Sequence, residues 1–520
     1  MKRRSVLGAG AAALALAACD DAPASWQGGW LGASFARGHR LRSGAAPAAD
    51  VQRRAGVLIV GAGIAGLSAA RGFALAGIDD VQLLELEDDA GGNSRGHVLA
   101  GQRCPLGAHY LPVPGTAAHE VADWLHEIGL LRQRLGRSVA DERYLCHSPQ
   151  ERLFFDGAWR EGFLPPAAPG STTLTQYRRF AAAVAAAQTL GFSVPTTASA
   201  WTPALAALDA QSFAAWLARA GLDDRRLLWY LDYCCRDDYG AGLASVSAWA
   251  GLHYFASRHG FHAPGDETAE REPVFTWPEG NAWLAARLAA PFKDRLHTGR
   301  TVLRVSEGRH EVSVLAWDEA AARAEQWTAA RVVLALPLFV AARVLERPPA
   351  ALREAAASQR HAPWLVGNLH LKAAPLPRPG LPLAWDNVEY GSGSSGSLGY
   401  VDAGHQRLNP APGPVVLTSY HALPVARRGA LLADSWATWA GRIVGDLSLL
   451  HPDLRSKVER IDLMRYGHAM AIPAPGQRGS AALAALRAMR GRVRFAHADL
   501  AAYSVFEEAF SAGLAAARDA

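Results

Sequence analysis

Residues 57–66 read VLIVGAGIAG, an apolar run rich in β-branched side chains that passes directly into a glycine-rich turn, and residues 67–76 have the composition of a helix. Gly61 permits the tight turn, Gly63 lets the backbone approach a pyrophosphate, and Gly66 allows close packing of the helix on the strand. The first N–H groups of the helix are then available to phosphate. The stretch predicts a strand, turn and helix that bind a dinucleotide.

A second apolar run, residues 81–84, ends at Glu85, which follows Gly66 by 19 residues. The acid that binds the ribose hydroxyls of a dinucleotide stands ~20 residues beyond the glycines. We therefore expect Glu85 to bind ribose. The alternative is an exposed carboxylate at the end of a strand.

The composition describes a folded chain. The 520 residues are 50% hydrophobic and 19% charged, and the mean hydropathy is near zero. This excludes a mostly disordered chain, and no internal span reaches transmembrane length. The length predicts two interleaved or consecutive domains. The net charge of +5 is partly due to the basic start of the chain, so no nucleic-acid partner is expected. Five cysteines without a CxxC or a Cys/His ligand spacing indicate neither a zinc site nor a disulfide scaffold.

Residues 1–19 combine a basic start, an apolar stretch and a terminal Leu-Ala-Ala-Cys, which are features of an export signal. The Arg-Arg-Ser-Val-Leu segment resembles the twin-arginine signal and Leu-Ala-Ala-Cys resembles a lipobox. The resemblance implies that Cys19 is lipidated and tethers the mature protein on the periplasmic side of the cytoplasmic membrane, where Asp20 and Asp21 favour its retention. The alternative is an ordinary secretory signal with an incidental cysteine. Residues 20–54, rich in Ala, Gly, Ser and Pro, are predicted to be a tether.

The segment after Glu85, residues 88–95, reads DDAGGNSR. It resembles the Gly-Gly-Arg element of flavin enzymes of the glutathione-reductase type, in particular the superfamily of flavin-containing amine oxidases and phytoene desaturases. The resemblance implies that the dinucleotide is FAD rather than NAD. Asn93 stands where the superfamily usually has arginine, so Arg95, two positions later, is the expected partner of the pyrophosphate.

Further blocks carry the same resemblance along nearly the whole mature chain. They are GAHYL at 107–111, WPEGN at 277–281, RVVLALP at 331–337, RFAHAD at 494–499 and the helical segment 507–517. Two departures stand near the expected flavin, since His497 and Glu508 each replace a glycine that is usual in the superfamily. The block at 236–255 resembles a subgroup of exported members.

The resemblance implies an α/β fold in which a Rossmann-like, glutathione-reductase-type FAD domain is interleaved with an α+β substrate domain. The expected ranges are 1–19 for the signal, 20–54 for the tether, 55–115, 271–345 and 476–520 for the FAD domain, and 116–270 and 346–475 for the substrate domain. The first substrate part is expected to be helical, because apolar residues recur at helical spacing in 121–130.

The fingerprint and the resemblance together predict the residues that contact FAD. They are Gly61, Gly63, Ile64, Ala65, Gly66, Glu85, Gly91, Gly92, Asn93, Arg95, Gly107, Ala108, His109, Val302, Asp499, Phe506 and Glu507. Because no cysteine follows Cys235, the cysteinyl flavin linkage of some amine oxidases is impossible. FAD is therefore expected to be non-covalent unless a histidine attaches it, and no metal is expected.

Catalytic residues are harder to predict, because a flavin accepts the hydride itself and the protein has only to position the substrate. Amine oxidases commonly have a lysine near flavin N5, but the strand expected over 364–371 has none and Lys372 falls only at its end. The two aromatic residues that usually flank the amine align with His468-Ala469 and Val505. The remaining candidates are His109, Tyr110, His253, Tyr254, His468 and Tyr503. For each of them, a packed structural side chain is the alternative.

The adjacent pair Cys234 and Cys235 could form a redox-active dithiol, although small core residues are the commoner role of such cysteines in an apolar helix.

Three functions fit the sequence. The first is an FAD-dependent oxidoreductase that oxidises a small organic substrate, for example an amine, by hydride transfer to N5. The second is a desaturase or porphyrinogen-oxidase-like enzyme acting on a lipophilic substrate, and the third is a non-catalytic FAD-bearing binding protein. Without the lysine, which is credited with helping reduced flavin react with oxygen, a quinone or a protein is the expected electron acceptor.

Overall fold

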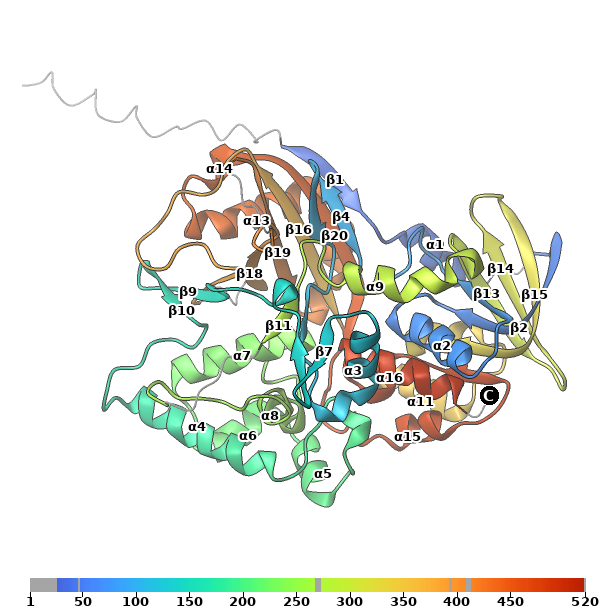
Figure 1. Cartoon of the computed structure of the whole chain (residues 1–520), viewed down its shortest axis with the longest axis horizontal. Helices are drawn as coiled ribbons and strands as arrows, with labels where there is room; N and C mark the ends of the chain where they lie inside the picture. Colours follow the sequence, from blue (N-terminus) through green and yellow to red (C-terminus); the bar gives the residue numbers. More distant parts are fainter. Residues whose placement is uncertain (1–25, 45–46, 267–272, 392–394, 408–412, 519–520) are drawn as a thin grey trace, which may run out of the picture.

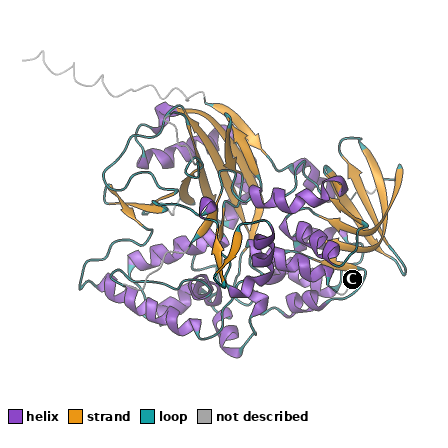
Figure 2. Ribbon diagram, in the orientation of Figure 1, coloured by secondary structure: helices purple, strands orange, loops and turns teal. Residues whose placement is uncertain are grey.

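The computed structural model describes residues 26–44, 47–266, 273–391, 395–407 and 413–518. The predicted signal, with Cys19, and the first residues of the predicted tether lie outside these ranges. Two sheets, one of seven and one of eight strands, occupy opposite halves of the molecule (Figure 1), and helices pack between and around them (Figure 2). This α/β architecture confirms the predicted fold class.

The seven-stranded sheet is built around the predicted fingerprint. Its strand β2 pairs in parallel with β3 and with β15, and β15 also pairs in parallel with β21. The last four residues of β2 are all buried, as in a parallel strand covered on both faces. The strands are β2 (Val51–Val60), β3 (Val81–Leu84), β12 (Leu296–His297), β13 (Arg300–Glu307), β14 (Val312–Asp318), β15 (Arg323–Leu334) and β21 (Val493–Phe495).

The first and last long helices of this domain lie side by side. Helix α2 (Ile64–Leu75) follows β2 after the glycine turn and packs against the C-terminal helix α16 (Phe506–Ala517). The contact requires glycine, because a Cβ at Gly513 would lie 2.2 Å from the carbonyl oxygen of Ala65. The start of α16 is thereby fixed beside the start of α2.

The eight-stranded sheet has β16 near its middle, paired antiparallel with β19 and β20. Side chains alternate along β16, so that Leu365 and Leu369 pack beneath helix α13 (Trp436–Leu450) and Trp364 and Val366 join the helical core on the other face. The strands are β1 (Gln27–Leu31), β9 (Glu151–Phe155), β10 (Ala158–Glu161), β16 (His361–Leu371), β17 (Asp386–Glu389), β18 (Ser397–Asp402), β19 (Val415–Ala422) and β20 (Val458–Ala471).

Five helices form the lower left of Figure 1 and enclose an apolar core. Ser171, Asp224 and Ser247 each accept a hydrogen bond from an N–H group of the first turn, which fixes where three of these helices begin. The helices are α4 (Thr172–Gln188), α5 (Pro203–Asp209), α6 (Phe213–Arg219), α7 (Arg225–Tyr239) and α8 (Ala248–Ala256).

The remaining helices and strands are short. They are α1 (Phe35–His39), β4 (Gly96–Leu99), β5 (Gln102–Pro105), β6 (Tyr110–Pro112), α3 (His119–Glu127), β7 (Leu131–Arg134), β8 (Arg137–Ala140), β11 (Val274–Thr276), α9 (Ala282–Ala289), α10 (Leu338–Val344), α11 (Ala350–Ser358), α12 (Arg428–Ala433), α14 (Leu454–Lys457) and α15 (Ala481–Ala488). No helix within the described ranges is long and apolar enough to cross a membrane.

Two sequence predictions are wrong in part. The segment 20–54 is not simply a tether, because its residues Gln27–Leu31 form β1 and pair in parallel with β20. The Ala-, Gly- and Ser-rich composition conceals Trp26 and Trp30, which pack against the core of the eight-stranded sheet. The segment 116–270 is not only helical, since it also contributes β7 to β10.

Candidate active site

A cavity of about 420 Å³ lies between the two halves of the molecule. Its walls come from the loops after β2 and β3, from β16, β19 and β20, and from the start of α16. Most residues predicted to contact FAD line it, namely Gly61, Gly63, Ile64, Ala65, Glu85, Gly91, Gly92, Asn93, Gly107, Ala108, His109, Val302, Asp499, Phe506 and Glu507. Gly66 and Arg95 are not among the lining residues.

Two glycine loops form a cradle at one end of this cavity. Gly63 and Gly91 are joined by a parallel β-bridge, and a Cβ on Gly92 would come within 3.3 Å of the Cα of Gly63. Gly61 has a φ of +99°, and a side chain there would also meet the carbonyl oxygen of Ala335 at 2.4 Å. The cradle thus exposes bare backbone to the cavity, as a pyrophosphate requires.

Gly66 and Arg95 support the cradle from behind. A Cβ on Gly66 would lie 1.8 Å from the carbonyl oxygen of Gly61, so this glycine permits the turn itself. The Nε of Arg95 donates to the carbonyl oxygen of Gly92 at 3.1 Å. The Arg95 guanidinium also lies 3.9 Å from the carboxylate of Glu87. In this structure Arg95 therefore shapes the second glycine loop rather than lining the cavity.

Glu85 lies at the end of β3, and it is buried rather than exposed. One of its carboxylate oxygens accepts from the backbone N–H of Ala62 at 2.7 Å and the other from the N–H of Glu87 at 3.0 Å. Burial raises the pKa of Glu85, while these backbone hydrogen bonds and nearby Arg95 oppose the rise. Glu85 thus ties the first glycine loop to the segment after β3 and presents a carboxylate to the cavity.

The site fits a flavin dinucleotide on its own features. Besides the glycine cradle, the cavity contains the side-chain oxygen of Asn281, which is buried and has no hydrogen-bond partner among the described residues. The Asn281 amide nitrogen donates to the carbonyl oxygen of Tyr110, which fixes the orientation of that oxygen. The cradle would hold the pyrophosphate, Glu85 the ribose, and Asn281 a hydroxyl of the cofactor. Asn281 was not predicted from sequence, because an unpaired oxygen is visible only after folding.

Two buried carboxyls near α16 differ in their electrostatics. Asp499 accepts hydrogen bonds from the imidazole of His361 at 3.1 Å and from the backbone N–H of Leu338 at 2.9 Å, and it lies 3.2 Å from His497. These partners overcome the cost of burial and hold the pKa of Asp499 well below its usual range. Burial, with a smaller contribution from neighbouring carboxylates, raises the pKa of Glu507 to about 7.

Aromatic side chains form another wall of the cavity. The ring of His109 stacks on Tyr420, with centroids 4.3 Å apart and planes at 24°. The Tyr420 hydroxyl donates to Gly107, the Tyr466 hydroxyl donates to Leu106, and Trp364 completes the wall. Burial lowers the pKa of His109 to about 3, so its imidazole is neutral. The sequence predicts no aromatic pair at the positions usual in the superfamily, yet β16, β19 and β20 supply Trp364, Tyr420 and Tyr466 to this wall.

The end of α7 brings two carboxyls to the same cavity. Asp238 accepts a hydrogen bond from Tyr503 at 2.8 Å and lies 3.3 Å from the guanidinium of Arg258. Asp237 has no hydrogen bond or ion pair with any described residue. Burial and the neighbouring carboxylate of Asp238 raise the pKa of Asp237 to about 7. Asp237 therefore lines the cavity with a carboxyl group that no hydrogen bond or ion pair with a described residue holds in place.

The predicted catalytic candidates separate into two groups. His109, Tyr110 and His468 line the cavity, and burial lowers the pKa of His468 to about 4. His253 and Tyr503 do not line it. His253 is buried, with its Nε2 2.8 Å from the carbonyl oxygen of Ser193. The Tyr503 hydroxyl contacts two residues of the lining, Asp238 at 2.8 Å and Arg258 at 3.3 Å.

Tyr254 is the remaining catalytic candidate that the sequence predicts. Tyr254 packs with Phe255 and is not among the lining residues.

The described lysines, Lys293, Lys372 and Lys457, all lie outside the lining, which agrees with the absence of lysine from the strand 364–371. No group of three or more potential metal-ligating side chains occurs within the described ranges.

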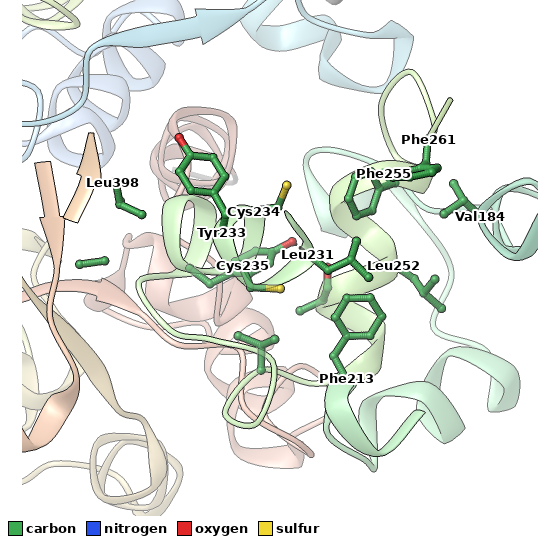
Figure 3. Close-up of a cluster of buried hydrophobic side chains, with 14 of the residues drawn as sticks. Val184, Phe213, Leu231, Tyr233, Cys234, Cys235, Leu252, Phe255, Phe261 and Leu398 are labelled. Carbon is green, nitrogen blue, oxygen red and sulfur yellow. Dashed lines mark hydrogen bonds between the residues drawn. The ribbon is translucent and has the colours of Figure 1, made fainter. Parts of the chain in front are cut away.

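Cys234 and Cys235 occupy the core rather than the cavity. Both thiols are free and buried, and burial raises the pKa of each. Figure 3 shows them among apolar side chains that include Leu231, Leu252 and Phe213. A thiol held in its protonated form is a poor nucleophile, so the core interpretation of this pair is favoured over the dithiol.

Comparison with known proteins agrees with this geometry. A family model described as flavin-containing amine oxidoreductase matches residues 64–520. A putrescine oxidase double mutant is similar in structure, with a TM-score of 0.66 and 18% identity, over 90% of this chain and 99% of that one. Cyclohexylamine oxidase from Brevibacterium oxydans gives 0.65 and 16%, over 89% and 98%. A protein from Exiguobacterium sp., described as a putative protoporphyrinogen oxidase, gives 0.59 and 15%, over 89% and 97%. No curated protein matches by sequence at a significant level.

Proposed function

Since the chain belongs to the family of flavin-containing amine oxidoreductases, we propose that the substrate of this FAD-dependent enzyme is a small organic amine. The cavity observation that carries the proposal is Asp237, a carboxyl without a partner in a cavity walled by aromatic rings. An ammonium ion is attracted both to a carboxylate and to the faces of aromatic rings. A neutral substrate would leave the carboxylate of Asp237 with only the electrostatic attraction of Arg258 and Arg236 to offset its burial, whereas an ammonium group would contact it directly.

The residues of this chain then act in a simple order. Asp237 binds the incoming ammonium group, and the wall of His109 and Tyr420 excludes water around it. An ammonium ion must lose a proton before the adjacent C–H bond can give up hydride, and a carboxylate with a pKa of about 7 is suited to accept that proton. FAD, when bound, supplies N5 as the hydride acceptor. Neutral His109 adds no competing positive charge.

Anaerobic titration tests the proposal. The flavin absorption of the purified enzyme should bleach with a primary amine such as benzylamine and remain unchanged with benzyl alcohol, which has the same ring without the charge. Bleaching by the alcohol, or only by lipophilic tetrapyrroles or polyenes, would contradict the proposal and favour the desaturase-like alternative.

We further propose that the electron acceptor is a quinone or a protein rather than oxygen. The support is the absence of lysine from the cavity among the described residues, so that no lysine ammonium stabilises charge developing on oxygen. Loss of one preorganised electrostatic contact costs roughly two to three orders of magnitude in rate. Stopped-flow mixing of dithionite-reduced enzyme should therefore show slow reoxidation by air and fast reoxidation by a soluble quinone. The reverse order of rates would exclude this proposal.

We also propose that the mature protein is lipid-anchored through Cys19 on the periplasmic side of the membrane. The support is the resemblance of the leader to a twin-arginine signal with a lipobox. Cys19→Ala should move the protein from the membrane fraction to the soluble or unprocessed fraction, with Ser43→Ala as a control that leaves the distribution unchanged. An unchanged membrane fraction for Cys19→Ala would rule out the anchor.

A further inference from the structure

The described part of the chain begins at Trp26, just before β1, and this end of the eight-stranded sheet lies next to helix α14 (Figure 1). The guanidinium of Arg455, on α14, lies over the ring of Trp26, 5.6 Å from its centroid. Cys19 precedes Trp26 by seven residues, a length of chain that spans at most about 25 Å. In the lipid-anchored protein proposed above, the surface around Trp26 and α14 therefore lies close to the bilayer.

Two exposed leucines lie beside α14. Leu376 is 62% exposed, and Leu449, in the last turn of α13, is 61% exposed. The backbone N–H of Leu376 donates to the carboxylate of Asp453, directly before α14, at 3.0 Å. The guanidinium of Arg378 donates to the carbonyl oxygen of Leu449 at 2.9 Å. These contacts hold both leucines on the same surface as α14.

Two basic side chains of this surface are available to a ligand. Lys372 and Arg455 are both exposed, and neither side chain has a hydrogen bond or ion pair with any described residue. The ring contact of Arg455 leaves its N–H groups without an acceptor. The carboxylates just before and just after α14 are already in ion pairs, Asp453 with Lys457 and Glu459 with His370. Uncompensated positive charge therefore stands next to exposed leucines.

This combination matches the boundary of an anionic bilayer. Leucine and tryptophan side chains enter the zone between head groups and acyl chains, and arginine and lysine are attracted to the phosphates of anionic lipids. Water is a poor environment for leucine side chains that are more than half exposed. The short link from Trp26 to Cys19 favours a lipid surface over a soluble protein as the partner.

We propose that the surface formed by Trp26, Lys372, Leu376, Leu449 and Arg455, here called the α14 surface, docks on an anionic lipid bilayer. The two leucines enter the head-group boundary, while Lys372 and Arg455 contact lipid phosphates. The lipid on Cys19 holds the protein at the membrane, and the α14 surface fixes its orientation there. This role is separate from amine oxidation, because no residue of the α14 surface lines the active-site cavity.

Co-sedimentation with lipid vesicles tests the docking. The probe is the FAD-loaded mature chain without its lipid, residues 20–520, which contains every residue that the structure describes. It should bind vesicles of phosphatidylglycerol at least tenfold more tightly than vesicles of phosphatidylcholine. Equal binding to both lipids, or no binding to phosphatidylglycerol, would overturn the proposal. Because this protein carries no lipid, the result is independent of the anchor, which the Cys19→Ala fractionation tests separately.

Matched variants locate the contact. Leu449→Glu should weaken binding to phosphatidylglycerol vesicles at least tenfold, whereas Leu75→Glu, at the 67% exposed last residue of α2, should change it less than twofold. Lys372→Glu should weaken binding at least fivefold, whereas Arg304→Glu, at an exposed position of β13, should change it less than twofold. An unchanged FAD content in all four variants shows that each is folded.

The hairpin of β7 and β8 supplies the strongest competing contact. Leu135 is fully exposed at its tip, between the exposed Arg134 and Arg137. Leu135→Glu should leave vesicle binding within about twofold of the wild type. Loss of binding in Leu135→Glu together with full binding in Leu449→Glu would assign the membrane contact to the hairpin and reject the α14 surface.

Discussion

Gly63→Ala should yield a folded protein that has lost most of its FAD. At Gly63 the backbone has a φ of −72° and a ψ of −177°, which alanine adopts readily, and the new Cβ would meet Gly92 Cα at an ordinary 3.7 Å. That Cβ would occupy the cradle where the pyrophosphate must approach bare backbone. Crowding of this kind costs ~1–3 kcal/mol, which corresponds to a roughly 5- to 150-fold weaker FAD affinity.

The measurement is the Kd of FAD by fluorescence quenching, together with the melting temperature of the apoprotein. Gly115→Ala is the matched control, because Gly115 has nearly the same backbone angles and nothing lies within 4 Å of its added Cβ. Gly66→Ala should fail to fold, since its Cβ would collide with the carbonyl oxygen of Gly61. Undiminished FAD content in Gly63→Ala, or a colourless wild-type protein, would contradict the assignment of the cradle.

Asp237→Asn should lower kcat/KM for amines by about 10- to 100-fold, the range expected when a charge-assisted hydrogen bond of ~1.5–3 kcal/mol is lost. Asparagine keeps the shape of the side chain but neither attracts the ammonium group nor accepts its proton. Asp123→Asn, at an exposed position of helix α3 outside the cavity lining, is the control and should leave kcat/KM within about twofold. Equal losses in both variants would contradict a specific role of Asp237.

The pH dependence of kcat/KM distinguishes a role of Asp237 in binding and deprotonating the amine from a structural role. Because the pKa of Asp237 is raised to about 7, the group is neutral below that pH and charged above it. In the wild type kcat/KM should therefore rise as pH increases through about 7, and this limb should be missing in Asp237→Asn. An identical limb in the variant would assign the titration to another group, such as Glu507.

Asp237→Asn should be more stable than the wild type above pH 7, although it is less active. A carboxyl whose pKa is higher in the folded than in the unfolded protein destabilises the fold increasingly as pH rises from about 4 to about 7, and fully above that. Removing its charge should raise the melting temperature at pH 8 and leave it unchanged at pH 4. A lower melting temperature at pH 8 would show that Asp237 has a structural role instead.

The sequence alone determined the part of this protein whose signals are local. Residues 57–66 and Glu85 are close in the chain, and a strand, a glycine turn and a helix follow from short-range sterics and from apolar periodicity. That unit, together with the resembling blocks up to α16, predicted the fold class and FAD as the cofactor. Arg95, which the sequence predicts to contact the pyrophosphate, donates to the carbonyl oxygen of Gly92 and is not among the residues that line the cavity.

Only the tertiary structure decided what surrounds the substrate. Asp237 ends a helix, while Tyr420 and Tyr466 lie on strands about 180 and 230 residues further along the chain, and no spacing in the sequence connects them. Strand β1 was likewise hidden, because its partner β20 begins more than 400 residues later. A backbone turn is specified by neighbouring residues, whereas the wall of a cavity is specified by which elements pack together, and that choice depends on burial across the whole chain.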